Sequence, residues 1–153
     1  MKPGEHAASL ILPVTVLLII PGLLAIYTRN MVLIPLWTLF SPFGWFAISI
    51  PFFVIGAYLS AKSIHLFATR GSGTLAPWSP THRMVIEGLY RYVRNPMITG
   101  VVILLLAESI ALQSVFVLLW CFLFLVGNHI YFIKSEEPGL VKRFGDEYLE
   151  YKE

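Results

Sequence analysis

Two polar segments of this sequence carry the side chains best suited to chemistry. The first, residues 82–100, reads HRMVIEGLYRYVRNPMITG, and the second, residues 136–151, reads EEPGLVKRFGDEYLEY. Arg94 can bind a carboxylate through its planar fork of donors, Glu136 can accept hydrogen bonds from an amine, and Tyr90 offers a π-face to a cation.

Each of these residues also has a structural interpretation. Arg91 and Arg94 could bind anionic lipid headgroups, and Pro96 could be an ordinary first residue of a helix. Glu137 precedes a proline and is well placed to cap a helix, so Glu136 is the better candidate ligand. The four histidines are spread too far along the chain to form a metal site, so we predict no metal.

The composition limits the environment in which these segments must work. The chain has 153 residues, of which 57% are hydrophobic and only 13% are charged, too little polar surface to cover a soluble globule. The net charge of +2 and the lack of a long basic run argue against nucleic acid as a partner. We therefore predict an all-α, multi-pass integral membrane protein.

Apolar runs indicate which elements position the two segments. Residues 7–28 and 43–67 each have the length of a membrane span, whereas residues 98–133 are too many for one helix. The last run predicts a helical hairpin whose turn lies in the ESIALQS segment at residues 108–114, with Glu108 as a turn residue. This interpretation gives about four transmembrane helices. The tail, residues 134–153, is predicted to be an amphipathic surface helix with one apolar face, formed by Leu140, Phe144, Tyr148 and Tyr151.

Basic residues predict how these helices are oriented. With four spans, ten of the eleven Lys and Arg residues fall on one side and only Arg29 falls on the other, so both termini and residues 69–96 are expected in the cytoplasm. The compact chain without an address signal suggests a prokaryotic inner membrane. We expect one membrane domain over residues 1–153, with N-terminal spans in residues 1–68 and the site in residues 69–153. The two polar segments then share a compartment and can meet.

The two segments resemble two ordered motifs of one family, the isoprenylcysteine carboxyl methyltransferases and phospholipid methyltransferases, which are integral membrane enzymes. The family pattern G-x-Y-x-x-x-R-H-P-x-Y-x-G corresponds to residues 88–100, and E-E-x-x-L-x-x-x-F-G-x-x-Y-x-x-Y corresponds to residues 136–151. The resemblance covers residues 72–151. This chain departs from the first pattern at Asn95, where the family has His, and at Ile98, where it has Tyr.

The resemblance implies a methyltransferase that uses S-adenosylmethionine without a soluble Rossmann-like domain. In the family, the loop before the hairpin and the acidic pair after it hold the cofactor. Carried over by position, Arg94 and Glu136 are the catalytic candidates. The cofactor-binding candidates are His82, Arg83, Met84, Val85, Tyr90, Asn95, Pro96, Met97, Ile98 and Glu136.

Three functions stay open at this point. The first is methyl transfer to a lipophilic acceptor, a prenylcysteine-type carboxylate or a lipid amine, which enters the cytoplasmic face of the site from the surrounding lipid. The second is a nicotinamide-dependent membrane reductase. The third is a non-catalytic membrane protein that retains the fold, an alternative favoured by the two departures at Asn95 and Ile98. Membrane lipids are expected partners in each case, and the oligomeric state stays open.

Overall fold

The regular structure in the described part of the chain is entirely helical. The computed structural model describes residues 13–28, 31, 38–70 and 88–152. In chain order its elements are η1 (Thr15–Ile19), α2 (Ile20–Thr28), α3 (Pro42–Arg70), η3 (Gly88–Arg91), α4 (Pro96–Ala111), α5 (Val115–Tyr131), η4 (Phe132–Glu136), α6 (Glu137–Phe144) and α7 (Asp146–Lys152). Here η1 and η4 are π-helical turns and η3 is a 3-10 turn. The predicted all-α class is confirmed for these residues.

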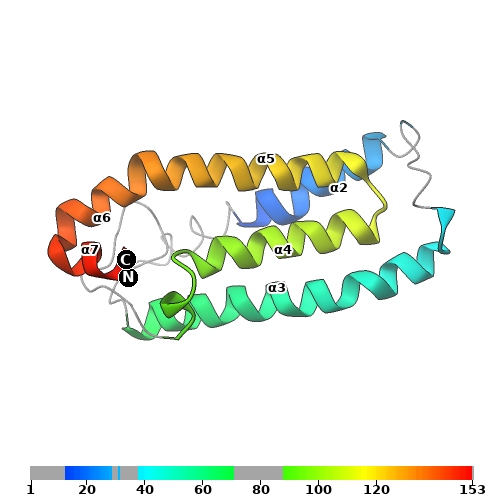
Figure 1. Ribbon diagram of the computed structural model, residues 1–153. Coiled ribbons are helices and arrows are strands. Elements are labelled where there is room, and N and C mark those ends of the chain that lie inside the picture. Colours follow the sequence, from blue (N-terminus) through cyan, green and yellow to red (C-terminus); the bar gives the residue numbers. More distant parts are fainter. Residues whose placement is uncertain (1–12, 29–30, 32–37, 71–87, 153) are drawn as a thin grey trace, which may run out of the picture.

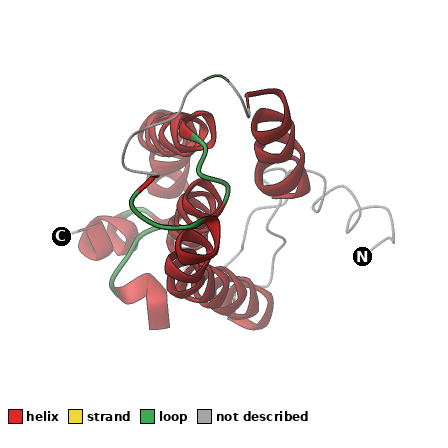
Figure 2. Cartoon of the chain, turned by 90° about the vertical axis from the view of Figure 1, so that its right-hand side faces the viewer, coloured by secondary structure: helices red, strands yellow, loops and turns green. Residues whose placement is uncertain are grey.

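The helices form an elongated bundle in which α4 lies between α3 and α5 (Figure 1). The π turn η1 and helix α2 pack on the hairpin formed by α4 and α5. Figure 2 shows the same bundle after a 90° rotation. The described regions in this view consist of helices and connecting loops. The start of α4 and the last helix, α7, lie at the same end of the bundle (Figure 1).

Within the described ranges, two helices are long and apolar enough to cross a membrane, Pro42–Leu66 and Val115–Phe144. Only 17% and 11% of their most apolar windows are buried, so these helices present their apolar side chains outward, as lipid contact requires. Thr15–Thr28 and Pro96–Ala111 are apolar but shorter. The 16 residues of α4 span about 24 Å, less than the ~30 Å hydrocarbon core. Of the roughly four spans that the sequence predicts, two therefore correspond to described helices of sufficient length.

Small residues bring α3 and α4 into backbone contact. A Cβ built at Gly100 would lie 2.8 Å from the Ser60 amide nitrogen, and one built at Gly56 would lie 2.9 Å from the Gly100 carbonyl oxygen. Real Cβ atoms do not approach other atoms this closely, so both positions require glycine at this helix spacing. Such contacts matter in lipid, where burial of apolar surface does not drive helices together and van der Waals packing must do so.

A second contact joins the N-terminal helix to the hairpin. Val16, Leu105 and Cys121 form a buried cluster, against which Trp120 and Phe124 also pack. The indole Nε1 of Trp120 donates a hydrogen bond to the Val16 carbonyl oxygen at 3.2 Å. Cys121 is buried and free, and it packs within this cluster.

The predicted helical hairpin is present, with a tighter turn than expected. α4 ends at Ala111, and Gln113 adopts the left-handed conformation with φ of 50°. Ser114 then caps α5, since its Oγ accepts a hydrogen bond from the Val117 amide at 3.3 Å. Glu108, expected in the turn, instead lies within α4.

The tail differs from its prediction. The sequence predicts one separate surface helix, whereas α5 continues through the π turn η4 into α6, and Gly145 ends that helix with φ of 54°. A positive φ is easily adopted only by glycine, and it turns the chain back into α7. Tyr148, predicted to belong to the apolar face of a surface helix, is consequently only 1% exposed.

We predict that Gly100→Ala lowers the free energy of unfolding by about 1–3 kcal/mol, because the added methyl group must push α3 away from α4. Gly127→Ala is the matched control, since a Cβ there meets no atom of the described residues within 4 Å. Alanine at position 127 should be neutral or slightly stabilising, because alanine favours helix. Unfolding of both variants in detergent measures the difference. Equal stability of the two variants would contradict the close helix contact.

Candidate active site

The turn before α4 brings the first polar segment to the end of the bundle. Gly88 has φ of 63°, and a Cβ there would lie 3.0 Å from Leu66 of α3. Glycine thus allows η3 to turn tightly against the end of α3. Tyr90 in this turn is 8% exposed, so its backbone and ring form part of a packed surface.

Asn95 begins α4 as its N-cap. Its Oδ1 accepts a hydrogen bond from the Ile98 amide at 3.2 Å, and Pro96 occupies the first helical turn, where a missing N–H costs nothing. The Thr99 hydroxyl donates to the Asn95 carbonyl oxygen at 3.0 Å. Asparagine is among the best capping residues, so the departure from the family's histidine preserves a well-formed entry to the hairpin.

The second polar segment returns to the same place through α7. The Tyr151 hydroxyl donates a hydrogen bond to the Tyr90 carbonyl oxygen, which joins α7 directly to η3. The rings of Tyr148 and Tyr151 lie 6.1 Å apart between centroids, at an interplanar angle of 50°. Three tyrosines from the two motifs, Tyr90, Tyr148 and Tyr151, therefore gather at one end of the bundle.

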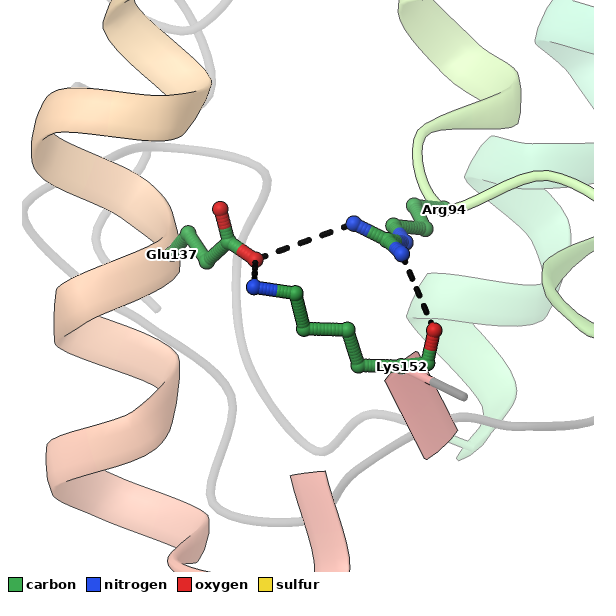
Figure 3. Close-up of polar contacts among 3 residues, drawn as sticks. All are labelled: Arg94, Glu137 and Lys152. Carbon is green, nitrogen blue, oxygen red and sulfur yellow. Dashed lines mark hydrogen bonds and ion pairs between the residues drawn. The ribbon is translucent and has the colours of Figure 1, made fainter. Parts of the chain in front are cut away.

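An ion cluster ties the start of α4 to α6 and α7 (Figure 3). Lys152 Nζ lies 2.5 Å from Glu137 Oε1, and Arg94 Nη1 lies 3.7 Å from the same oxygen. Arg94 Nη2 also donates a hydrogen bond to the Lys152 carbonyl oxygen at 3.0 Å. The side chain of Glu137 is 13% exposed, against 43% for Arg94 and 45% for Lys152, so two half-exposed cations cover a mostly buried carboxylate.

The contacts of Glu137 correct one prediction. The sequence favours Glu137 as a helix cap, but the N-cap of α6 is Glu136, and α6 has no side-chain capping hydrogen bond. Glu137 lies in the first turn of α6, and its carboxylate pairs with Lys152 and Arg94 instead. The two residues of the acidic pair thus have different surroundings, one in the ion cluster and one at the end of the π turn η4.

Glu136 lies close enough to Tyr90 to affect its ionisation. Burial raises the pKa of Tyr90 to about 12, with further contributions from Tyr151 and from the negative charge of Glu136. The Tyr90 phenol consequently stays neutral throughout the physiological pH range. A half-buried carboxylate beside a neutral aromatic ring forms an environment that favours a cation.

The structure brings together only part of the predicted site. Four of the predicted site residues lie at or just before the start of α4: Tyr90, Arg94, Asn95 and Pro96. Glu136 and α7 reach the same end of the bundle. Met97 and Ile98 are half-buried in the first turn of α4, where the Ile98 amide is taken by the Asn95 cap. The remaining predicted cofactor contacts, which fall outside the described residues, are His82, Arg83, Met84 and Val85.

Sequence reasoning missed the contribution of α7. The periodicity of the tail favours a single surface helix, but α7 folds back to the first segment. Tyr151 and Lys152 hydrogen-bond to Tyr90 and Arg94, and Tyr148 lies close enough to Arg94 for its pKa to be affected. The signal that identifies the break is Gly145, a residue that commonly ends helices.

Comparison with known proteins supports the family assignment. The model of the phospholipid methyltransferase family matches residues 44–147, well over half of the chain. The matched range begins in α3 and includes Tyr90, Arg94, Glu136 and Glu137, but it stops one residue before Tyr148. No curated protein and no solved structure matches this chain.

We predict that Asn95→Ala lowers the free energy of unfolding by about 1 kcal/mol, because the Ile98 amide loses its capping partner. Asn95→Ser retains a capping oxygen and should remain close to the original stability. Denaturant unfolding of both variants in the same detergent provides the comparison. If alanine and serine behave alike, capping is not the role of this residue.

Proposed function

Because the chain belongs to the phospholipid methyltransferase family, we propose that it transfers a methyl group from S-adenosylmethionine to a lipophilic acceptor at the membrane surface. The acceptor class comprises lipid amines and prenylcysteine-type carboxylates. The observation that carries this proposal is the meeting of Tyr90 and Arg94 with the acidic pair at the junction of η4 and α6, at one end of an apolar helical bundle. Family membership indicates the reaction class, and the meeting of these residues supports this end of the bundle as the proposed site of the reaction.

The residues at this end of the bundle fit the proposed cofactor. When bound, S-adenosylmethionine supplies an electrophilic methyl group on a sulfonium, which leaves as a neutral thioether once the acceptor takes the methyl. Glu136 offers an acceptor for an ammonium or ribose hydroxyl, and the neutral Tyr90 ring offers a π-face to a cation. Among the described residues Arg94 donates one hydrogen bond, to the Lys152 carbonyl oxygen, so other guanidinium donors can serve a ligand.

Methyl transfer places modest demands on side-chain chemistry. The reaction requires in-line alignment of the acceptor with the methyl group and exclusion of water, and both depend on packing. Buried tyrosines contribute to that packing, since Tyr90 is 8% and Tyr148 is 1% exposed. The proposed role of this end of the bundle is therefore to orient both reactants and to keep water away from the methyl group.

Transfer of labelled methyl groups by the purified chain tests the proposal. The protein is reconstituted in vesicles that contain phosphatidylethanolamine, and in parallel with a prenylated cysteine, and both are supplied with methyl-labelled S-adenosylmethionine. Label in either acceptor supports the proposal and identifies the acceptor class. Binding of NADPH without binding of S-adenosylmethionine would favour a reductase, and binding of neither would favour a non-catalytic protein.

We predict that Glu136→Gln weakens binding of S-adenosylmethionine by roughly 1.5–3 kcal/mol, at least about tenfold, because a charge-assisted hydrogen bond is lost while the side-chain shape is kept. Glu147→Gln in the first turn of α7 is the control, since Glu147 is exposed and should leave the affinity unchanged. Isothermal titration with the solubilised protein measures both. An unchanged affinity in Glu136→Gln would remove this residue from the cofactor site.

We predict that Arg94→Lys lowers kcat/KM for methyl transfer at least about tenfold, equivalent to about 1.4 kcal/mol, because an ammonium cannot reproduce the planar fork of a guanidinium. Arg91→Lys, at an exposed position three residues earlier, should keep nearly full activity. Thermal melting of each variant separates loss of function from loss of folding. If Arg94→Lys keeps nearly full activity, Arg94 acts only as a positive charge that contacts lipid headgroups.

A further inference from the structure

The Tyr148 hydroxyl is a buried polar group without a partner in the described part of the chain. The residue is 1% exposed, and its hydroxyl oxygen has no hydrogen bond there. Buried hydroxyl groups in native proteins are nearly always hydrogen-bonded, because leaving one unpaired costs free energy. An exception at the end of the bundle that carries both motifs therefore needs an explanation.

The backbone around Tyr148 holds its side chain in place. Gly145 turns the chain so that α7 folds back, and the Tyr151 hydroxyl fastens α7 to the Tyr90 carbonyl oxygen. The Tyr148 ring packs beside the ring of Tyr151 at 6.1 Å between centroids. With the ring packed in this way, the hydroxyl cannot turn out to water without displacing α7.

Charges of both signs act on this hydroxyl. Burial and the charge of Glu137 raise the pKa of Tyr148, so its hydroxyl remains a hydrogen-bond donor at physiological pH. Arg94 is the cation that lowers this pKa among the described residues, so a second strong donor group lies near the hydroxyl. The 3.7 Å separation between Arg94 and Glu137 is too long for a hydrogen bond, so donors of the guanidinium remain available on that side.

We propose that the Tyr148 hydroxyl and the Arg94 guanidinium together form a subsite for an anionic oxygen group of a reactant. This inference rests on the proposed function, which supplies two sources of such a group: the phosphate of an acceptor phospholipid and the carboxylate of S-adenosylmethionine. Both are planar or tetrahedral oxyanions that a hydroxyl and a guanidinium can bind together. In this proposal Tyr148, a residue of the second motif, is a binding residue for the reaction.

The opposing explanation is a purely structural role. In this role the Tyr148 hydroxyl would donate to Glu137, the charge with the largest effect on its pKa. In that case Tyr148 would position the ion cluster and would contribute to folding stability alone. The two roles differ in whether removal of the hydroxyl changes ligand affinity.

Tyr148→Phe removes the hydroxyl and keeps the ring, and Tyr92→Phe, at a tyrosine that is 84% exposed, is the matched control. Two quantities are measured on the full chain in lipid nanodiscs: the Kd for S-adenosylmethionine and the KM for phosphatidylethanolamine. We expect Tyr148→Phe to raise one of them about tenfold, because a hydrogen bond to a charged group is lost. A change in Kd identifies the cofactor carboxylate as the source, and a change in KM alone identifies the lipid phosphate.

Inorganic phosphate serves as a probe that requires no activity. Phosphate should raise the melting temperature of the original chain and of Tyr92→Phe, and should raise that of Tyr148→Phe much less. If the original chain responds in this way but transfers no methyl group, the subsite stands and the proposed function fails. A Tyr148→Phe variant with unchanged Kd, KM and phosphate response overturns the subsite, whatever its melting temperature.

Discussion

The close contact between α3 and α4 determines where the candidate site can form. Gly56 and Gly100 let the two helix backbones approach within the distance that a side chain would occupy. In lipid, such packing is the main source of helix association, because apolar surface is already in an apolar solvent. Gly100 lies about one turn after Pro96, so the same contact fixes the start of α4 and with it Asn95 and Arg94.

The end of the bundle must satisfy two opposite requirements. Charged groups such as Arg94 and Lys152 need water or partners, whereas the proposed methyl transfer needs a dry environment around the reacting carbon. The helix α7 meets both requirements, because it supplies the Lys152 side chain to the ion cluster and the nearly inaccessible Tyr148 to the interior. A short amphipathic helix is suited to this position, since one of its faces is polar and the other is packed.

The sequence predicts those features that depend on local composition and run length. An apolar run too long for one helix predicts the α4–α5 hairpin, and the polar ESIALQS segment predicts its turn to within a few residues. The meeting of the two motifs then follows from the hairpin geometry. The span count is less predictable, because α4 is apolar throughout and yet too short to cross a full bilayer core.

Contacts between distant residues were beyond prediction from local patterns. The apolar periodicity of Leu140, Phe144, Tyr148 and Tyr151 continues across Gly145, so it conceals the break that sends α7 back to η3. The ion pair between Glu137 and Lys152 likewise depends on that break, which is why the sequence predicts helix capping for Glu137 instead. The resemblance of the motifs predicts where the site lies, and the turn at Gly145 determines which side chains of α7 reach the same end of the bundle.

The fastening of α7 to η3 also has a consequence for biosynthesis. Among the described residues, Tyr151 of α7 donates a hydrogen bond to Tyr90 of η3, and Arg94, which lies between η3 and α4, donates one to Lys152 of α7. These bonds join residues that are 61 and 58 positions apart in the chain. Every residue of the α4–α5 hairpin is synthesised before either bond can form. The apolar helices can therefore enter the membrane while the charged groups of the site are still in water, and the site is assembled only after α7 has left the ribosome.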